Sequence, residues 1–345
     1  MSVITIVGAG MMGSAMCFPA CDNGHTVRLV GSPLDRDIIN RAQKDGYHIT
    51  LKRQLPEGVQ PFQIDQLEEA LQGAELVISG VSSFGADWFE QTVLPLLGEE
   101  QPVLSVTKGL ELQDDGTLLP LPVAMTNRAK KKVSLNAVGG PVISFELADR
   151  QQTEIAFCGF DVDVLKKIKS LLETDYYHIS LTTDVAGLEC AVAMKNCYAL
   201  GVALAIGLNE QKNGEGCPEK YNPQAALFEA STREAIRLID LLGGRTESLV
   251  YFAGDLYVTV FGGRTRRIGI LLGRGHSFTE AREILSGVTL ESVAIATRAA
   301  ESVRRLAEKG ITRVEDFPLL MHIDEIINGG ALVDVPWNDF EVISV

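Results

Sequence analysis

The chain has 345 residues, of which 46% are hydrophobic and 22% are charged, and its formal net charge is −14. This composition indicates a folded globular protein, and the length is more than one compact core usually holds. The acidic balance argues against a nucleic-acid-binding protein, which needs a basic face, but it allows an anionic small molecule to bind at a local basic cluster.

The first half of the chain alternates apolar runs with helical segments. The apolar run 3–7, bounded by glycine, predicts a buried parallel strand, and the turn at 8–13 leads into a helix that Pro19 should kink. Further strands are expected at 26–30, 75–79, 102–106, 134–138 and 153–157, and helices at 67–73 and 87–97. This alternation predicts a Rossmann-like, doubly wound and mostly parallel sheet.

From about Asp184 onward the pattern is helical. Helices are expected at 185–208, 223–242, 266–272, 278–286, 290–308 and 318–327, and the polar, glycine-bearing segment 209–222 predicts an exposed loop. We therefore divide the chain into an α/β domain of residues 1–184 and an all-helical domain of residues 185–345, with chemistry expected where the two meet.

Two observations bear on location. Only segment 186–208 resembles a membrane span, but it carries Glu189 and Lys195, which are costly in lipid, so we expect a buried helix and no span. The first apolar stretch is too short for a signal peptide, and none of the six cysteines forms a CxxC pair. We therefore expect the cysteines to be free thiols in a reducing compartment, and the protein to be cytoplasmic.

The turn Gly8-Ala9-Gly10-Met11-Met12-Gly13 fits the pattern GxGxxG directly after a strand and before a helix. Gly8 permits the tight turn, Gly10 lets the backbone approach a pyrophosphate, and Gly13 allows close packing of helix on strand. The helix start, including Met11 and Met12, offers free N–H groups to the phosphates. The pattern predicts a dinucleotide site in residues 1–184.

The end of the second predicted strand bears on which dinucleotide binds. An acidic residue at that point would bind the ribose hydroxyls of NAD, but the chain reads Gly31-Ser32-Pro33. Ser32 is placed to contact a 2′-phosphate, and Arg36 lies nearby together with two aspartates. The cofactor is therefore NAD or NADP, with a lean to NADP.

Two features of the second half carry chemistry. Lys195 lies in the middle of a predicted helix, in an apolar stretch. Desolvation there would favour the neutral amine, which suits a general acid/base. The alternative is a lysine whose side chain reaches solvent at the domain surface. A basic cluster at 264–267, preceded by glycines, lies at the expected start of a helix. Positive charge is unfavourable there because of the helix dipole, so an anion-binding site is favoured over a solvated helix start. No two histidines show metal-ligand spacing, and no metal is expected.

These motifs, in this order and over nearly the whole chain, resemble the NAD(P)-dependent glycerol-3-phosphate dehydrogenase family. The motifs that carry the resemblance are the glycine turn, Thr107-Lys108-Gly109-Leu110-Glu111, Gly140-Pro141 with Glu146, Met194-Lys195-Asn196, Gly254-Asp255-Leu256 with Thr259, and Gly263-Arg264 with Arg266-Arg267. The resemblance implies hydride transfer between NAD(P)H and a small phosphorylated ketone such as dihydroxyacetone phosphate. We also expect a homodimer.

The resemblance also implies roles for single residues. Lys195 is the expected catalytic acid/base, Asp255 supports it, and Lys108 contacts the substrate at the catalytic site. The residues expected to line the substrate phosphate and the nicotinamide are Asn196, Thr259, Arg264 and Thr265, with Arg264 also serving the cofactor.

Some positions depart from the family pattern. Thr265 replaces an asparagine, Val142 and Ile143 replace serine and phenylalanine, Ala230-Ser231 replaces arginine-glycine, and Ser82 replaces a proline. The catalytic frame is intact while the substrate shell has changed, so another phospho-ketose or a phosphonate is an alternative substrate.

Two further alternatives concern the class of protein. A 3-hydroxyacid dehydrogenase or a ketopantoate-type reductase also pairs a glycine turn with a lysine-bearing helical domain, but the segment 254–267 is not expected in them. A non-catalytic NAD(P) sensor is disfavoured because it would not need Lys195 and Asp255 together.

Overall fold

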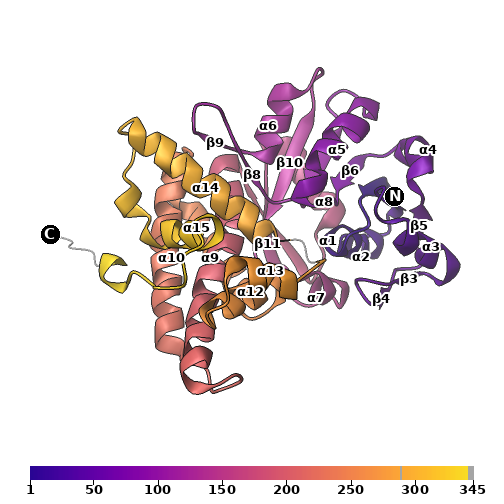
Figure 1. Cartoon of the computed structure of the whole chain (residues 1–345). Helices are drawn as coiled ribbons and strands as arrows, with labels where there is room; N and C mark the ends of the chain where they lie inside the picture. Colours follow the sequence, from indigo (N-terminus) through magenta and orange to yellow (C-terminus); the bar gives the residue numbers. More distant parts are fainter. Residues whose placement is uncertain (288–289, 341–345) are drawn as a thin grey trace. The chain divides into compact units, whose positions relative to one another are not determined.

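The structure is a computed structural model that describes residues 1–287 and 290–340, and the chain forms two compact units. The first unit contains residues 1–108 and 121–185, and the second contains residues 109–120 and the chain from Ala186 onward (Figure 1). The two-part division expected from sequence therefore differs from the structure at residues 109–120. These residues belong to the second unit, and the chain returns to the first unit at Leu121.

An eight-stranded sheet organises the first unit, in the order β12-β11-β10-β7-β6-β1-β2-β5. Its strands are β1 (Val3–Val7), β2 (Thr26–Val30), β5 (Val59–Phe62), β6 (Leu76–Ser79), β7 (Pro102–Ser105), β10 (Ser134–Gly139), β11 (Thr153–Cys158) and β12 (Tyr177–Thr182). All neighbours pair in parallel except β10 and β11. The predicted mostly parallel sheet is confirmed.

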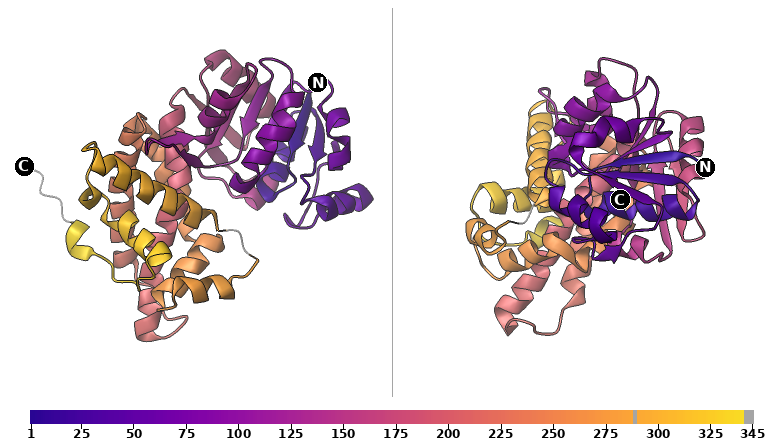
Figure 2. Two further views of the ribbon diagram at one scale, coloured as in Figure 1. Left: turned by 45° about the horizontal axis from the view of Figure 1, so that its top comes forward. Right: turned by 90° about the vertical axis from the view of Figure 1, so that its right-hand side faces the viewer.

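Both faces of the sheet are covered by helices (Figure 2). Alternate side chains of a strand enter different cores: Ile4 and Ile6 of β1 join one cluster, and Val7 joins the other. The first core includes residues of α1 (Met11–Ala15), α2 (Cys17–Asp22), α3 (Arg36–Asp45), α7 (Ser144–Ala148) and α8 (Val162–Leu172). The second includes residues of α4 (Leu67–Leu71), α5 (Ala86–Trp88), η3 (Phe89–Val93), η4 (Leu94–Leu96) and α6 (Leu121–Arg128).

Two local features place the glycine turn. The helix after the turn is divided at Met16 into α1 and α2, because Pro19 has no N–H and its ring meets the carbonyl four residues earlier. The expected effect of Pro19 is therefore seen as an interruption that leaves a short first helix. Strand β1 lies between β2 and β6, so the chain reverses its direction of winding beside β1. Ligands of doubly wound folds bind at such a point, outside the carboxyl ends of the strands.

Over its described residues, the second unit is helical apart from one hairpin (Figure 1). Its helices are α9 (Val185–Asn213), α10 (Tyr221–Leu241), α11 (Leu249–Val260), α12 (Gly263–Gly273), α13 (Phe278–Ile284), α14 (Glu291–Glu308) and α15 (Pro318–Asn328). The hairpin of β8 (Leu110–Leu112) and β9 (Leu118–Pro120) packs on α14, where Ser302 Oγ donates to the carbonyl of Gly116.

Helix α9 is the central element of the second unit. It is long and apolar enough to cross a membrane by length and composition, but 83% of its most apolar window is buried inside the protein. Such burial is typical of a core helix. The predicted exposed loop at 209–222 was wrong in its first part, because α9 continues to Asn213 through a polar final turn.

Candidate functional site

The glycine turn lies at the carboxyl end of β1 and is packed against the end of β6. Gly8 has φ +107°, and a Cβ on it would lie 2.7 Å from the carbonyl carbon of Gly80. A Cβ on Gly13 would lie 2.9 Å from the Cα of Gly80. Three glycines thus bring helix α1 onto two strand ends, which leaves the backbone N–H groups at the start of α1 open for a dinucleotide pyrophosphate.

Side chains that follow β2 also reach this turn. Asp35 Oδ2 accepts hydrogen bonds from the N–H of Ala9 at 3.0 Å, from the N–H of Ser32 at 2.8 Å and from Ser32 Oγ at 2.6 Å. The Asp35 carboxylate therefore ties the segment after β2 to the glycine turn. The expectation that Ser32 contacts the cofactor stays a prediction.

The second unit brings Lys195, Asp255 and Thr259 together. Lys195 Nζ on α9 donates to Asp255 Oδ1 at 2.6 Å and to Thr259 Oγ1 at 2.9 Å, both on α11. Thr259 Oγ1 in turn donates to the carbonyl of Asp255, which fixes the orientation of the hydroxyl. The Asp255 side chain is fully buried and that of Lys195 is 12% exposed, so an ammonium is held at the edge of an apolar core.

Helix α12 begins three residues after α11 ends and carries the predicted basic cluster. Arg264 is exposed in its first turn, and Thr265 beside it is half-buried. Arg266 has a structural role, since it pairs with Glu219 at 2.6 Å and donates to the carbonyl of Val260. Arg264, the exposed Arg267 and the N–H groups at the start of α12 are therefore candidate donors to an anion.

A glycine contact fixes α12 against α9. A Cβ on Gly207 of α9 would lie 2.7 Å from the Cα of Gly273, and a Cβ on Gly269 would lie 2.6 Å from the Cβ of Ala203. The two helices therefore meet backbone to backbone, and this contact sets where Arg264 stands relative to Lys195 within the unit. The sequence signal for it is a pair of glycines four residues apart in α12.

The remaining predicted residues are divided between the two units. Asn196 is half-buried on α9 next to Lys195, whereas Lys108 follows β7 as the last residue of the first unit before the β8–β9 hairpin. Of the positions that depart from the family pattern, Val142 and Ile143 are half-buried in the loop after β10. Ala230 of α10 is buried in the core of the second unit.

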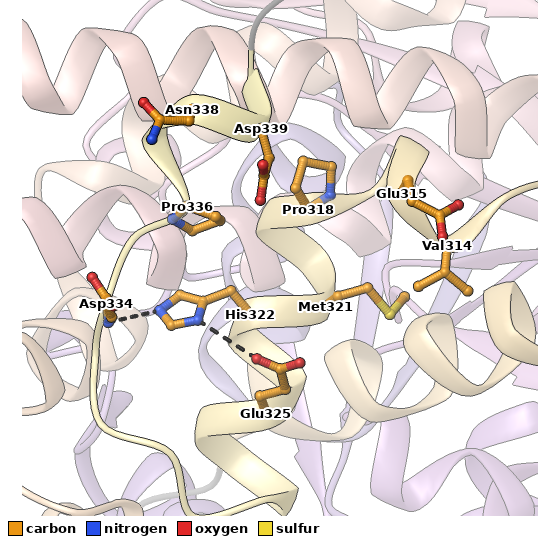
Figure 3. A pocket seen from close by; sticks show the side chains of 10 residues that line it. All are labelled: Val314, Glu315, Pro318, Met321, His322, Glu325, Asp334, Pro336, Asn338 and Asp339. Carbon is orange, nitrogen blue, oxygen red and sulfur yellow. Dashed lines mark hydrogen bonds and ion pairs between the residues drawn. The ribbon is translucent and has the colours of Figure 1, made fainter.

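A separate cavity of about 530 Å³ opens beside α15 in the second unit (Figure 3). Its lining includes four carboxylates, those of Glu315, Glu325, Asp334 and Asp339. His322 lies among them, and its Nε2 accepts a hydrogen bond from the N–H of Asp334 at 3.1 Å. An acidic lining repels a phosphorylated substrate, so this cavity does not compete with the α12 region as an anion site.

Comparisons with known proteins identify the family. A model described as NAD-dependent glycerol-3-phosphate dehydrogenase N-terminus matches residues 3–164, and the corresponding C-terminus model matches residues 184–336. The chain belongs to this family. This membership agrees with the resemblance carried by the sequence motifs and favours it over the ketopantoate-type alternative.

The relatives give the same result, and the solved structures match the fold. The NADP(+)-dependent glycerol-3-phosphate dehydrogenase of Archaeoglobus fulgidus is 34% identical over 89% of this chain and 90% of its own. A glycerol-3-phosphate dehydrogenase [NAD(P)+] of Koribacter versatilis is 30% identical, over 87% of each chain. The fold matches the glycerol-3-phosphate dehydrogenase of Coxiella burnetii with a TM-score of 0.80 at 23% identity, over 98% of this chain and 97% of that one. A ketopantoate reductase of Ralstonia eutropha matches at 0.56 and 16% identity, over 96% and 99%.

Proposed function

We propose that the protein reduces dihydroxyacetone phosphate to glycerol 3-phosphate with NAD(P)H, and catalyses the reverse reaction. The observation that carries the proposal is the Lys195 ammonium, held by Asp255 and Thr259 at the edge of a buried core. A proton donor fixed in this way suits a carbonyl oxygen that becomes an alkoxide. The Arg264-bearing start of α12 in the same unit supplies a binding site for the substrate's phosphate.

Each residue of the site has a proposed role in the reaction. The nicotinamide supplies the hydride when the dinucleotide is bound at the glycine turn. Lys195 Nζ donates a proton to the carbonyl oxygen of the substrate, and positioned acid catalysis of this kind contributes about 10²–10⁴-fold. Asp255 and Thr259 hold Nζ in place, so little reorganisation accompanies proton transfer. Lys108 is proposed to hydrogen-bond the substrate oxygens, with Asn196, Thr265 and Arg264 binding the substrate around the phosphate.

The phosphate role of Arg264 has a direct test. Arg264→Ala should raise KM for dihydroxyacetone phosphate by about tenfold or more, because a charge-assisted contact is lost. It should leave the KM of a neutral ketone such as dihydroxyacetone unchanged. Arg282→Ala, which removes another exposed arginine of the same unit, is the control. An equal loss with both ketones would contradict the assignment.

For the cofactor, we propose NAD or NADP with a preference for NADP. The relative from Archaeoglobus fulgidus is named as NADP(+)-dependent, and no acidic residue directly follows β2. Arg36 begins α3 four residues after Ser32, and its side chain makes an exposed ion pair with Asp65 that a 2′-phosphate can replace. Arg36→Ala should therefore weaken NADPH binding several-fold and leave NADH binding unchanged; an equal effect on both cofactors would contradict the proposal.

We further propose a cytoplasmic homodimer. All six cysteines are free thiols, as expected in a reducing compartment. Tyr257 on α11 and Phe261 directly after it are more than half exposed and stack edge to face at 4.8 Å, which is a costly surface to leave in water. Light scattering on the purified chain tests the dimer, and a monomer at micromolar concentration would contradict it.

The substrate is tested by a panel read through NADH and NADPH oxidation. Dihydroxyacetone phosphate, other phospho-ketoses, ketopantoate and short oxo-acids are compared at equal concentration. The proposal expects the highest kcat/KM with dihydroxyacetone phosphate. A higher value with another phospho-ketose would assign the changed positions Val142, Ile143, Ala230 and Thr265 to that substrate instead.

A further inference from the structure

The residue between the first two glycines of the turn is held by side chains from another segment. Its N–H donates to Asp35 Oδ2 at 3.0 Å, and its carbonyl lies 3.0 Å from Nε2 of His48. Asp35 precedes α3 and His48 follows it in the short strand β3 (Tyr47–His48). One segment after β2 thus reaches both polar groups of Ala9.

The hydrogen bonds around His48 define which nitrogen carries the proton. The N–H of Leu51 can only donate, and it lies 3.0 Å from Nδ1, so Nδ1 is an acceptor. Nε2 therefore bears the hydrogen, which points at the carbonyl of Ala9 and at Ser14 Oγ, 2.8 Å away on α1. The ring is completely buried, and this burial lowers the pKa of His48, which keeps the imidazole neutral near pH 7.

This arrangement has a consequence for the turn. Ala9 lies between two glycines, and glycines leave a free backbone with many accessible conformations. A turn that must present N–H groups to a pyrophosphate binds more tightly when its geometry is fixed beforehand. Because Asp35 occupies the N–H of Ala9, the phosphates must use N–H groups further along, at the start of α1.

We infer that Asp35 and His48 are positioning residues that clamp Ala9 and preorganise the glycine turn for the dinucleotide. The inference rests on the proposed function only in taking this turn as the cofactor site. Neither side chain is required to touch the reacting atoms, so the effect belongs to cofactor affinity and not to the chemical step.

The test compares two replacements of His48 that keep different halves of the ring's hydrogen bonding. His48→Gln retains a donor near the Nε2 position and can still reach the carbonyl of Ala9. His48→Asn retains an acceptor near Nδ1 for the N–H of Leu51 but loses Ala9. The dissociation constant of NADPH, measured by fluorescence titration and repeated with NADH, should rise about three- to tenfold in His48→Asn and clearly less in His48→Gln.

Matched controls separate the clamp from general destabilisation. His322→Gln removes another buried histidine that accepts a backbone N–H, and Asp161→Ala removes an aspartate that caps α8 in the first unit. Both should leave the NADPH dissociation constant unchanged. Asp35→Ala should raise it by about tenfold, because three donors lose a charged acceptor. At saturating cofactor, kcat and the KM of the ketone should stay within twofold in all clamp variants.

The possible failures are distinguishable. If wild-type protein binds neither dinucleotide, both the proposed function and the clamp are overturned. If it binds NADPH, and His48→Asn and Asp35→Ala bind it as tightly, the clamp alone is overturned. A larger effect of His48→Gln than of His48→Asn would also overturn it, because the loop around Leu51 and not Ala9 would then be what His48 holds.

Discussion

The ion pair of Lys195 and Asp255 predicts that losing one partner destabilises the protein more than losing both. Its Nζ–Oδ1 distance is 2.6 Å, and both side chains are largely removed from water. Removing one partner of a buried ion pair leaves an uncompensated charge and costs about 3–5 kcal/mol, whereas replacing both with apolar groups of similar volume is often neutral. Lys195→Met and Asp255→Leu should each destabilise the protein, and the double variant should be more stable than either.

The exposed fractions of the two side chains also predict which single variant loses more stability. Lys195→Met leaves a carboxylate with no exposed surface, so its cost should be near the upper value, about 5 kcal/mol. Asp255→Leu leaves an ammonium that retains Thr259 and some access to solvent, so its cost should be nearer 3 kcal/mol.

Denaturant unfolding of the wild type, both single variants and the double variant gives the coupling energy. The exposed pair Arg41 and Asp45, at 2.8 Å on α3, is the control, and its coupling energy should be much smaller because both groups are solvated. Additive effects of Lys195→Met and Asp255→Leu would refute the reasoning, because they would mean that the two charges are separately solvated.

Two further predictions concern the helical unit. Burial raises the pKa of Glu234 to about 7, so the native state keeps a proton that the unfolded state loses near pH 4.5. The free energy of unfolding of the wild type should therefore fall by roughly 3 kcal/mol, relative to that of Glu234→Gln, as pH rises from 4.5 to 8. Parallel curves of stability against pH for the two proteins would contradict this. Gly273→Ala places a Cβ 2.8 Å from the Cα of Gly207, so it should displace α12 and raise KM for the phosphorylated ketone several-fold despite the better helix propensity of alanine. Gly98→Ala, whose Cβ would make only an ordinary contact with Gln101 Oε1 at 3.8 Å, is the control, and equal KM values for the two variants would contradict the packing argument.

The sequence predicted the elements whose pattern is strong and local. Strand β1, the glycine turn and the long helix α9 follow from a continuous apolar run, three spaced glycines and the apolar stretch 186–208. Helix α3 was not predicted, since only Ile39 and Ala42 of its ten residues are buried and the rest are mainly polar or charged. Strand β5 contains Pro61, which is tolerated because this strand lies at the edge of the sheet.

The candidate site was predicted in part for a similar reason. Asp255 and Thr259 are four residues apart and so share one face of α11. Only the family resemblance linked Asp255 to Lys195, 60 residues away, and the contact between Thr259 and Lys195 was not predicted. Asp35 and His48 gave no signal, because their partner is a backbone group that any sequence possesses. Contacts of this kind depend on tertiary structure and not on local pattern.

The central claim is that Lys195 donates the proton in reduction of a phosphorylated ketone. The most direct measurement compares kcat for dihydroxyacetone phosphate reduction, at saturating NADPH, between wild type and Lys195→Met, with cofactor binding measured on both. The account predicts ketone-dependent oxidation of NADPH by the wild type and a loss of at least about 10²-fold in the variant, with the NADPH dissociation constant unchanged. Turnover near the wild-type level in Lys195→Met would contradict it.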